Sequence, residues 1–300
     1  MSTCSAWSRL EALDPIGSAP EVDGFLLLPW PLPWPADLGD VALLHDVWSK
    51  SDELEIRVQG IVDNLKAPTD VTLYRKAADR SGFRGYTATR RAALGPDEVI
   101  ATALALLAEE PPEAHHDAAP TDVLICTHGK RDRCCGSLGT SLFSELHQAE
   151  LGCRVQRTSH TGGHRFAPTG VVLPEGTLWA ELDQDLMRRI LDRSGPIAEV
   201  LPHYRGCTGL HGGPAAQVIE RAALARLGWA LLDAARTTTV LPDGRIRLDV
   251  TMPDGSEHSW EGRVDVGRTL PLPQCGQPAA AATKSVSEYV LGDLISLAPA

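Results

Sequence analysis

Residues 121–164, TDVLICTHGKRDRCCGSLGTSLFSELHQAELGCRVQRTSHTGGH, contain the pattern that decides the fold. The short apolar run at 121–127 predicts a strand, and Leu142, Leu146 and Leu151 are plausible core positions of a helix at 138–152. Residues 153–160 alternate as a second strand does. We therefore expect a β-α-β unit whose two strands each end in a loop that carries cysteine or histidine.

The residues that follow extend this unit. Residues 171–182 predict a hairpin around Pro174 and Gly176, and residues 183–195 predict a closing helix. The order β-α-β-β-β-α over residues 120–205 is that of a thioredoxin-like unit. The sequence thus predicts an α/β protein with a thioredoxin-like domain at 120–205.

The chain before this unit predicts a similar but shorter order. A strand is expected from Phe25, a helix at 51–65 from apolar residues at helical spacing, two strands at 70–77 and 85–90, and a helix at 96–110. The polar, proline-bearing residues 111–120 predict a linker. Residues 1–115 are therefore expected to form an α/β half with the order β-α-β-β-α, related to the thioredoxin-like unit.

Residues 206–300 predict a small α+β region. A glycine-rich loop is followed by an amphipathic helix that ends at Gly228. Three alternating strands are separated by turns at Pro242 and Pro253, and the tail after Gln274 predicts a further strand or helix. We expect this region to have a structural role.

Composition narrows the classes of function. The 300 residues include 39 acidic and 28 basic side chains, for a formal charge of -11. This balance argues against nucleic acid and against an anionic membrane as partners. The first 15 residues lack the pattern of a signal peptide, so we expect a cytoplasmic protein. Three of the seven cysteines crowd into ten residues, which favours metal or redox chemistry over a disulfide framework.

Two short motifs carry the donors for a metal. Eight residues separate Cys126 from Cys135, and three separate His160 from His164. Both motifs follow predicted strands, whose ends can converge at one edge of a sheet. Two thiolates and two imidazoles fit either a tetrahedral zinc ion or a 2Fe-2S cluster, and the residues alone leave both open.

The adjacent Cys134 and Cys135 leave a third reading open. They precede a predicted helix, whose N-terminus can lower the pKa of a thiol, so a cysteine-based thiol oxidoreductase is an alternative. For a 2Fe-2S cluster, two thiolates and two neutral imidazoles give an oxidised centre of about zero charge. Such a centre accepts an electron more readily than one held by four thiolates, and protonation of an imidazole can accompany the reduction.

The segments CTHGKRDRCCG (126–136), SHTGGHRFAPTGVVLPEG (159–176) and HYRG (203–206) resemble the sucrase/ferredoxin-like proteins among the thioredoxin-like 2Fe-2S ferredoxins. The resemblance is strong over 120–206 and looser elsewhere. It implies that Cys126, Cys135, His160 and His164 bind the cluster. Cys134 remains a rival to Cys135, because the sequence does not show which thiolate points inward.

The resemblance implies an electron carrier that works with a reductase or acceptor protein, rather than an enzyme with its own substrate. Lys130, Arg131 and Arg165 are expected around the cluster, where they would favour its reduced form or dock an acidic partner. Solvated loop residues are the alternative reading. No pair of carboxylates suggests glycoside hydrolysis. The other cysteines match no ligand spacing, and we expect them to be structural; they are Cys4, Cys153, Cys207 and Cys275.

Overall fold

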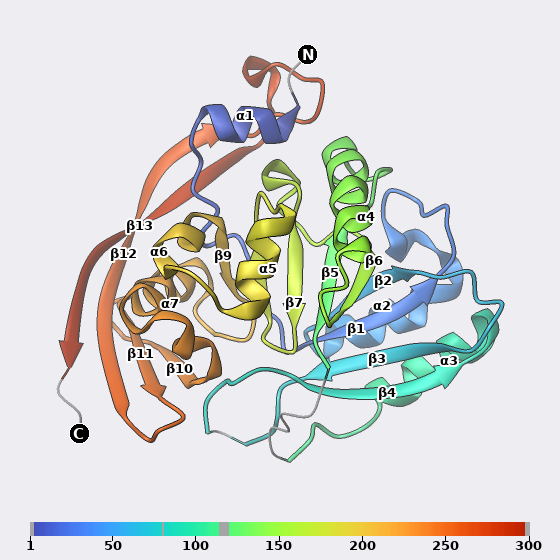
Figure 1. Cartoon of the computed structure of the whole chain (residues 1–300), viewed down its shortest axis with the longest axis horizontal. Coiled ribbons are helices and arrows are strands. Elements are labelled where there is room, and N and C mark those ends of the chain that lie inside the picture. Colours follow the sequence, from blue (N-terminus) through green and yellow to red (C-terminus); the bar gives the residue numbers. More distant parts are fainter. Residues whose placement is uncertain (1–2, 80, 114–119, 298–300) are drawn as a thin grey trace.

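The computed structural model of the chain describes residues 3–79, 81–113 and 120–297. Its main layer is a mixed sheet of nine strands in the order β4-β3-β1-β2-β6-β5-β7-β8-β9 (Figure 1). These strands are β1 (Gly24–Trp30), β2 (Ile56–Val62), β3 (Thr69–Arg75), β4 (Thr87–Ala93), β5 (Asp122–Cys126), β6 (Arg154–Thr158), β7 (Gly170–Leu173), β8 (Thr177–Trp179) and β9 (Tyr204–Cys207). A second, antiparallel sheet consists of β10 (Ala235–Val240), β11 (Ile246–Thr251), β12 (Glu257–Pro271) and β13 (Ser285–Leu297).

The helices lie between and around these strands. They are α1 (Cys4–Leu10), α2 (His45–Glu53), α3 (Gly95–Leu107), α4 (Thr140–Gln148), α5 (Gln184–Asp192), α6 (Ile197–Val200) and α7 (Gly213–Leu227). A π-helical turn, η3 (Cys135–Gly139), precedes α4, and 3₁₀ turns include η4 (His164–Phe166) after β6. Other 3₁₀ turns are Leu38–Asp40, Ala42–Leu44, Leu201–His203, Gly228–Asp233 and Ala279–Ala281. None of the described helices is long and apolar enough to cross a lipid bilayer.

The main sheet contains two halves with the same strand order and directions. In the first half β1 runs parallel to β2, while β3 is antiparallel to β1 and β4 to β3. In the second half β5, β6, β7 and β8 repeat this arrangement. Antiparallel pairing of β2 with β6 joins the halves at Ile61 and Thr158. The sheet is therefore continuous across the expected linker, of which residues 114–119 lie outside the described residues.

One predicted element of the first half is wrong. Residues 51–65 were expected to form a helix, but α2 ends at Glu53 and residues 56–62 form β2, in register with β1. A strand inside a sheet is apolar on both faces, so its apolar residues fit a helical period as well as an extended one. β-Branched residues such as Ile56 and Val58 favour the strand. The first half thus has the order β-α-β-β-β-α and not β-α-β-β-α.

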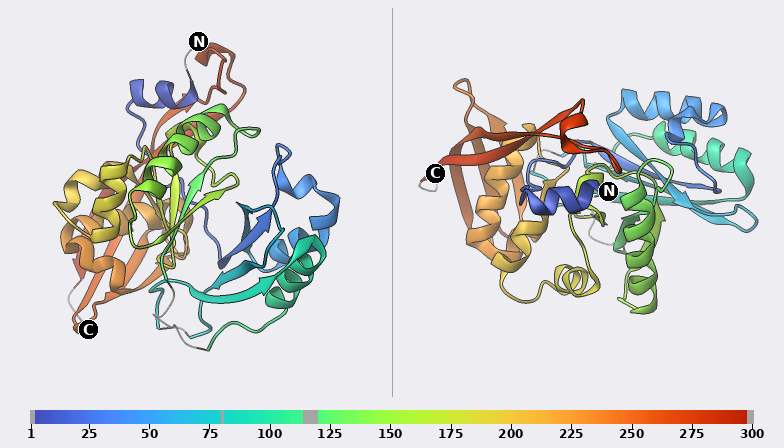
Figure 2. Two further views of the ribbon diagram at one scale, coloured as in Figure 1. Left: turned by 45° about the vertical axis from the view of Figure 1, so that its right-hand side comes forward. Right: turned by 90° about the horizontal axis from the view of Figure 1, so that it is seen from above.

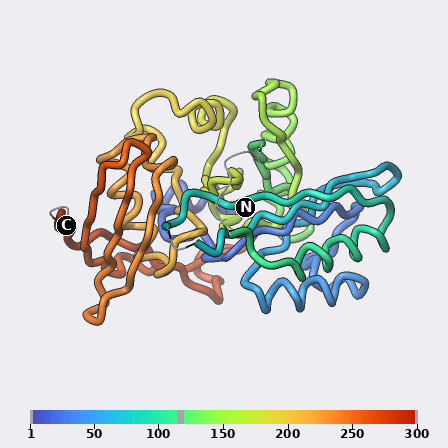
Figure 3. Tube along the Cα trace, turned by 90° about the horizontal axis from the view of Figure 1, so that it is seen from below, coloured from blue at the N-terminus to red at the C-terminus, as the bar shows by residue number. Residues whose placement is uncertain are grey.

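The helices of the two halves cover opposite faces of the sheet (Figures 2 and 3). Leu26 and Leu28 of β1 pack towards α2 and α3, whereas Val123 and Ile125 of β5 pack towards α4 and α5. The alternate residues of β1 and β5, among them Phe25, Leu27 and Leu124, share a third core. Alternation along each strand therefore supplies both a helix-covered face and an inner face.

The C-terminal region has the predicted elements, and two of its strands extend further than expected. Helix α7 ends at Gly228, and turns connect β10 to β11 and β11 to β12 where the sequence predicts them. α7 packs against β9 and against the second sheet. Strands β12 and β13 are long enough to carry the loop at residues 272–284 away from this sheet to α1 and the N-terminal end of α4 (Figure 1).

Candidate metal centre

The cysteine and histidine loops lie at the carboxyl ends of two adjacent parallel strands. Cys126, the last residue of β5, pairs with Thr158, the last residue of β6. The Thr127 N–H donates to the Thr158 carbonyl at 3.0 Å, which keeps the strands together as the loops begin. His160 follows two residues after β6. The two loops therefore leave the sheet side by side, as the sequence predicts.

Two glycines permit the close packing of these loops. A Cβ on Gly139 would lie 1.9 Å from the Cys126 carbonyl oxygen, so only glycine lets the η3 turn approach the end of β5. Gly163 has a φ of +68°, and a Cβ there would lie 2.6 Å from the guanidinium of Arg205. The first glycine brings Cys135 to Cys126, and the second lets the histidine loop turn over a buried arginine.

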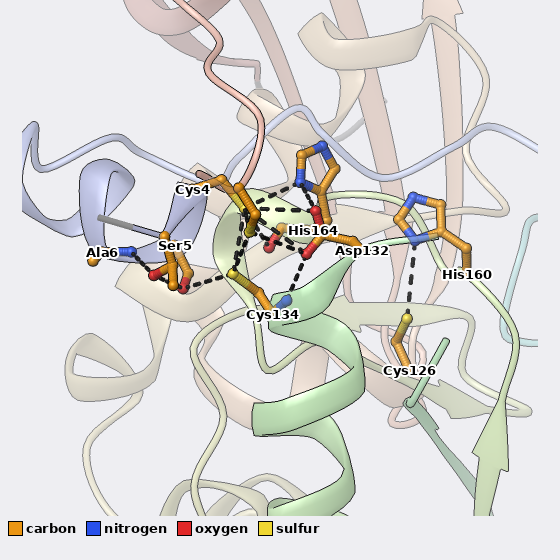
Figure 4. A network of polar contacts seen from close by, with 10 residues as sticks. Cys4, Ser5, Ala6, Cys126, Asp132, Cys134, His160 and His164 are labelled. Atoms are coloured by element: carbon orange, nitrogen blue, oxygen red, sulfur yellow. Dashed lines mark hydrogen bonds and ion pairs between the residues drawn. The ribbon is translucent and has the colours of Figure 1, made fainter. Parts of the chain in front are cut away.

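Three of the four predicted ligands converge. The donor atoms of Cys126, Cys135 and His160, called here the primary group, all lie within 4.8 Å of one another. Cys126 Sγ is 3.9 Å from His160 Nδ1 (Figure 4), and both cysteines are fully buried. Hydrogen bonds from the Cys135 thiol and from His160 hold the pKa of Cys126 well below its ordinary value, against the effect of burial.

The fourth predicted ligand, His164, lies beside the primary group but faces away from its thiols. Its ring centroid is 6.0 Å from that of His160. Its Nδ1 lies 3.0 Å from Asp132 Oδ2 and 3.2 Å from Cys4 Sγ. Since Nδ1 is engaged by Asp132, its Nε2 is the nitrogen left for a metal.

A second cluster of donors was not predicted. Cys4, Asp132, Cys134 and Cys275, called here the outer group, have donor atoms within 4.8 Å of one another. Cys134, the rival to Cys135 in the prediction, thus lies with Cys4 and Cys275, whereas Cys135 lies with Cys126. Cys4 and Cys275 were expected to be structural because no spacing marks them. The looser part of the family resemblance covers both cysteines, but only the tertiary fold brings them together with Cys134.

The remaining cysteines lie apart from both groups. Cys207 is buried in the core shared by β1 and β5, where burial raises the pKa of its thiol to about 12. Cys153 is half-buried and packs against the core beneath α4 and α5.

Three arginines without a carboxylate partner surround the two groups. Among the described residues, Arg57, Arg165 and Arg205 form no ion pair with Asp or Glu. Arg205 is fully buried, and its guanidinium donates to the Gly162 and Ser18 carbonyls. Arg57 donates to the His160 carbonyl at 2.9 Å, which fixes the loop that carries the imidazole.

The pKa values of these arginines show which anions they face. Burial lowers the pKa of Arg205 to about 9 and that of Arg165 to about 10. The charges of Cys126 and Cys135 act in the opposite direction on Arg205, as does that of Cys4 on Arg165. A buried cation is costly unless an anion lies nearby. Within each pair one thiol is favoured as a thiolate, the form in which cysteine binds metals: the hydrogen bond to Cys126 raises the pKa of Cys135, and the hydrogen bond to Cys134 raises that of Cys4.

The predicted basic residues fall into two environments. Lys130 and Arg131 are exposed and line a cleft of about 620 Å³ together with His160, His164 and Cys275. The Arg131 guanidinium lies 3.4 Å from Asp37 Oδ2. Arg165 is instead half-buried, with its guanidinium stacked on Phe166. His160 of the primary group therefore lines the same cleft as the basic side chains of Lys130 and Arg131.

His128, in the cysteine loop, is a structural residue. Its Nε2 lies 2.7 Å from the Pro35 carbonyl, and its ring packs edge-to-face on Trp34. Its side chain is buried, and neither donor group includes it.

The donors of the primary group suit a metal centre. Two buried thiols and an imidazole, with His164 adjacent, are the donor types of both zinc and histidine-ligated 2Fe-2S sites. The buried arginines add positive charge that would favour a centre able to take up an electron.

One comparison with known proteins is informative. A family model described as sucrase/ferredoxin-like matches residues 15–206, from before β1 to the end of the main sheet. No curated protein and no solved structure gives a significant match. The matched residues include the whole primary group but neither Cys4 nor Cys275 of the outer group.

Proposed function

This chain belongs to the sucrase/ferredoxin-like family, and from that premise we propose that it transfers single electrons through a 2Fe-2S cluster. Cys126, Cys135, His160 and His164 would hold the cluster. The observation that carries the proposal is the convergence of two buried thiols and His160 near arginines that have no carboxylate partner within residues 3–79, 81–113 and 120–297.

The cluster, when bound, supplies a site for one electron. The chain's residues set its environment. Oxidised, a centre with two thiolates and two neutral imidazoles has a charge of about zero, and reduction makes it an anion. The fully buried Arg205 and the half-buried Arg57 lie near the thiols and would stabilise that anion. His160 lines the open cleft, where its outer imidazole nitrogen could exchange a proton with solvent.

The domain arrangement and the docking site for a partner follow from the same features. We propose that residues 1–115 and 120–205 are two thioredoxin-like units and that residues 206–300 form a third, α+β region in a cytoplasmic protein. The equal strand order of the two halves supports the first part. An acidic redox protein would dock at the cleft, where Lys130, Arg131 and Arg133 lie.

The direct test is an anaerobic visible spectrum before and after dithionite, with iron and zinc assayed on the same sample. We expect a brown protein with about two irons per chain that bleaches on reduction. Zinc at the primary group, with no iron and no bleaching after cluster reconstitution, would refute the electron carrier. Thiol oxidoreductase activity that survives metal removal and depends on Cys134 and Cys135 would favour the third reading.

Replacing a histidine ligand by cysteine is expected to lower the reduction potential. His160→Cys exchanges a neutral imidazole for a thiolate and so makes the centre more negative. The reduction potentials of 2Fe-2S centres with two histidine ligands exceed those of all-cysteine centres by at least about 250 mV. Exchanging one histidine should therefore lower the potential by on the order of 100 mV. Protein-film voltammetry measures it. His147→Cys, on α4 away from both groups, is the control and should leave the potential unchanged.

Removing the buried charge of Arg205 is expected to lower the potential too. A unit charge within about 10 Å contributes roughly 70 mV at an effective dielectric constant of about 20. Arg205→Met should lower the potential by this order, while Arg205→Lys, which keeps the charge, should recover most of it. Equal potentials for both variants and the wild type would show that Arg205 serves the loop geometry alone.

A further inference from the structure

The outer group contains three thiols from segments far apart in the chain. Cys4 is the first residue of α1, Cys134 precedes η3, and Cys275 lies in the loop between β12 and β13. Their sulfurs form a triangle, with Sγ–Sγ distances of 3.4 Å (Cys4–Cys134), 3.3 Å (Cys4–Cys275) and 3.0 Å (Cys134–Cys275). Cys4 and Cys134 are buried and Cys275 is half-buried.

A carboxylate completes this triangle. Asp132 Oδ1 lies 3.7 Å from Cys275 Sγ and 3.9 Å from Cys4 Sγ, and it accepts the Cys134 N–H at 2.8 Å. Asp132 Oδ2 lies 3.0 Å from His164 Nδ1 (Figure 4). The Asp132 side chain is thus oriented by two hydrogen bonds, as the outer partners of metal ligands orient them in known metal sites.

We propose that Cys4, Cys134, Cys275 and Asp132 form a second metal site, which binds one tetrahedral Zn²⁺. Three thiolates and a carboxylate are ligands that zinc accepts. At a Zn–S distance of about 2.3 Å, the sulfurs of a tetrahedral site lie about 3.8 Å apart, so the triangle would open by less than about 1 Å. The sulfurs are too close together for each to bind a different iron of a cluster, which makes a mononuclear site the better fit.

The surroundings of the site support a built metal centre over a chance meeting of thiols. Ser5 donates to Cys134 Sγ at 3.4 Å, which ties the first turn of α1 to the cysteine loop. The half-buried guanidinium of Arg165 has no carboxylate partner among the described residues. The charge of Cys4 raises the pKa of Arg165, against the effect of burial. The site joins α1, the cysteine loop and the β12–β13 loop at one point. It would therefore hold α1 and the β12–β13 loop against the cysteine loop.

The test is the zinc content of the full-length protein, purified with reductant and Zn²⁺ and measured together with iron. We expect about one zinc ion per chain in the wild type. Cys275→Ser should lose at least nine-tenths of it while keeping the iron content and visible spectrum, because Cys275 has no contact with the primary group. Cys153→Ser, a cysteine outside both groups, is the matched control and should keep zinc and iron.

Cobalt supplies an independent readout. Co²⁺ added to zinc-free protein should give the intense d–d bands of a tetrahedral thiolate site, weakened or lost in Cys275→Ser. Cys126→Ala should lose iron but keep the zinc, so the failure of one site is distinguishable from failure of the other. A wild type that binds neither Zn²⁺ nor Co²⁺, or that shows a Cys134–Cys275 disulfide under reducing purification, would overturn the proposal.

Discussion

Replacing Cys126 by alanine is expected to abolish the cluster. Cys126 is fully buried at the end of β5, and its thiolate is the donor that His160 and Cys135 both approach. With it gone, a 2Fe-2S cluster would retain only three of its four proposed ligands. We expect iron to fall from about two per chain to below about 0.2, with loss of the visible bands.

The control for this prediction is Cys153→Ala, which removes a thiol remote from both groups. It should keep the iron and the spectrum. Circular dichroism of both variants separates loss of the cluster from loss of the fold, because the sheet is held by contacts far from the site. A Cys126→Ala protein that retained two irons and its spectrum would remove Cys126 from the ligand set.

Truncating Glu220 is expected to cause the largest loss of stability. Glu220 on α7 and Arg236 on β10 form an ion pair with both side chains fully buried. Tyr204 of β9 donates to Glu220 Oε2 at 2.8 Å, and the Cys207 N–H donates to the same atom at 3.3 Å. One carboxylate thus connects the last strand of the main sheet with the C-terminal region.

Glu220→Ala would leave Arg236 buried and unpaired, so we expect the free energy of unfolding to fall by about 3–5 kcal/mol. Urea unfolding measures it. The control Glu199→Ala breaks an exposed pair with Arg189 and should cost less than about 1 kcal/mol. Glu220→Leu combined with Arg236→Met should recover much of the loss, because it removes both charges. A loss below about 1 kcal/mol for Glu220→Ala would mean that solvent reaches Arg236.

This network bears on function through β9. Tyr204 and Cys207 flank Arg205, the buried cation beneath the histidine loop. Loosening β9 in Glu220→Ala is therefore expected to affect the primary group as well as the C-terminal region. The reduction potential of this variant, compared with that of Arg205→Lys, distinguishes a displaced arginine from a retained one.

The sequence determined most of the local elements and the two loops that supply the primary group. The cysteine and histidine motifs follow short apolar strands, and parallel strands bring their carboxyl ends together, so the convergence of these two loops follows from local pattern. It also placed the hairpin at Pro174 and the helix that ends at Gly228. The helix predicted at 51–65 was wrong because a strand that is buried on both faces lacks the alternation of apolar and polar residues that distinguishes a strand from a helix.

The tertiary structure alone decided the rest. The choice between Cys134 and Cys135 depends on which way the η3 turn faces, and Gly139 against the Cys126 carbonyl sets that. The approach of Cys4 and Cys275 depends on two strands that extend from the second sheet across the molecule. The HYRG motif suggested that Arg205 supports the cluster loop, but only the tertiary structure shows that its guanidinium is fully buried and donates to the Gly162 carbonyl of the histidine loop. Such contacts arise from packing between segments that are far apart in the chain, and no regular spacing in the sequence marks which distant segments will meet.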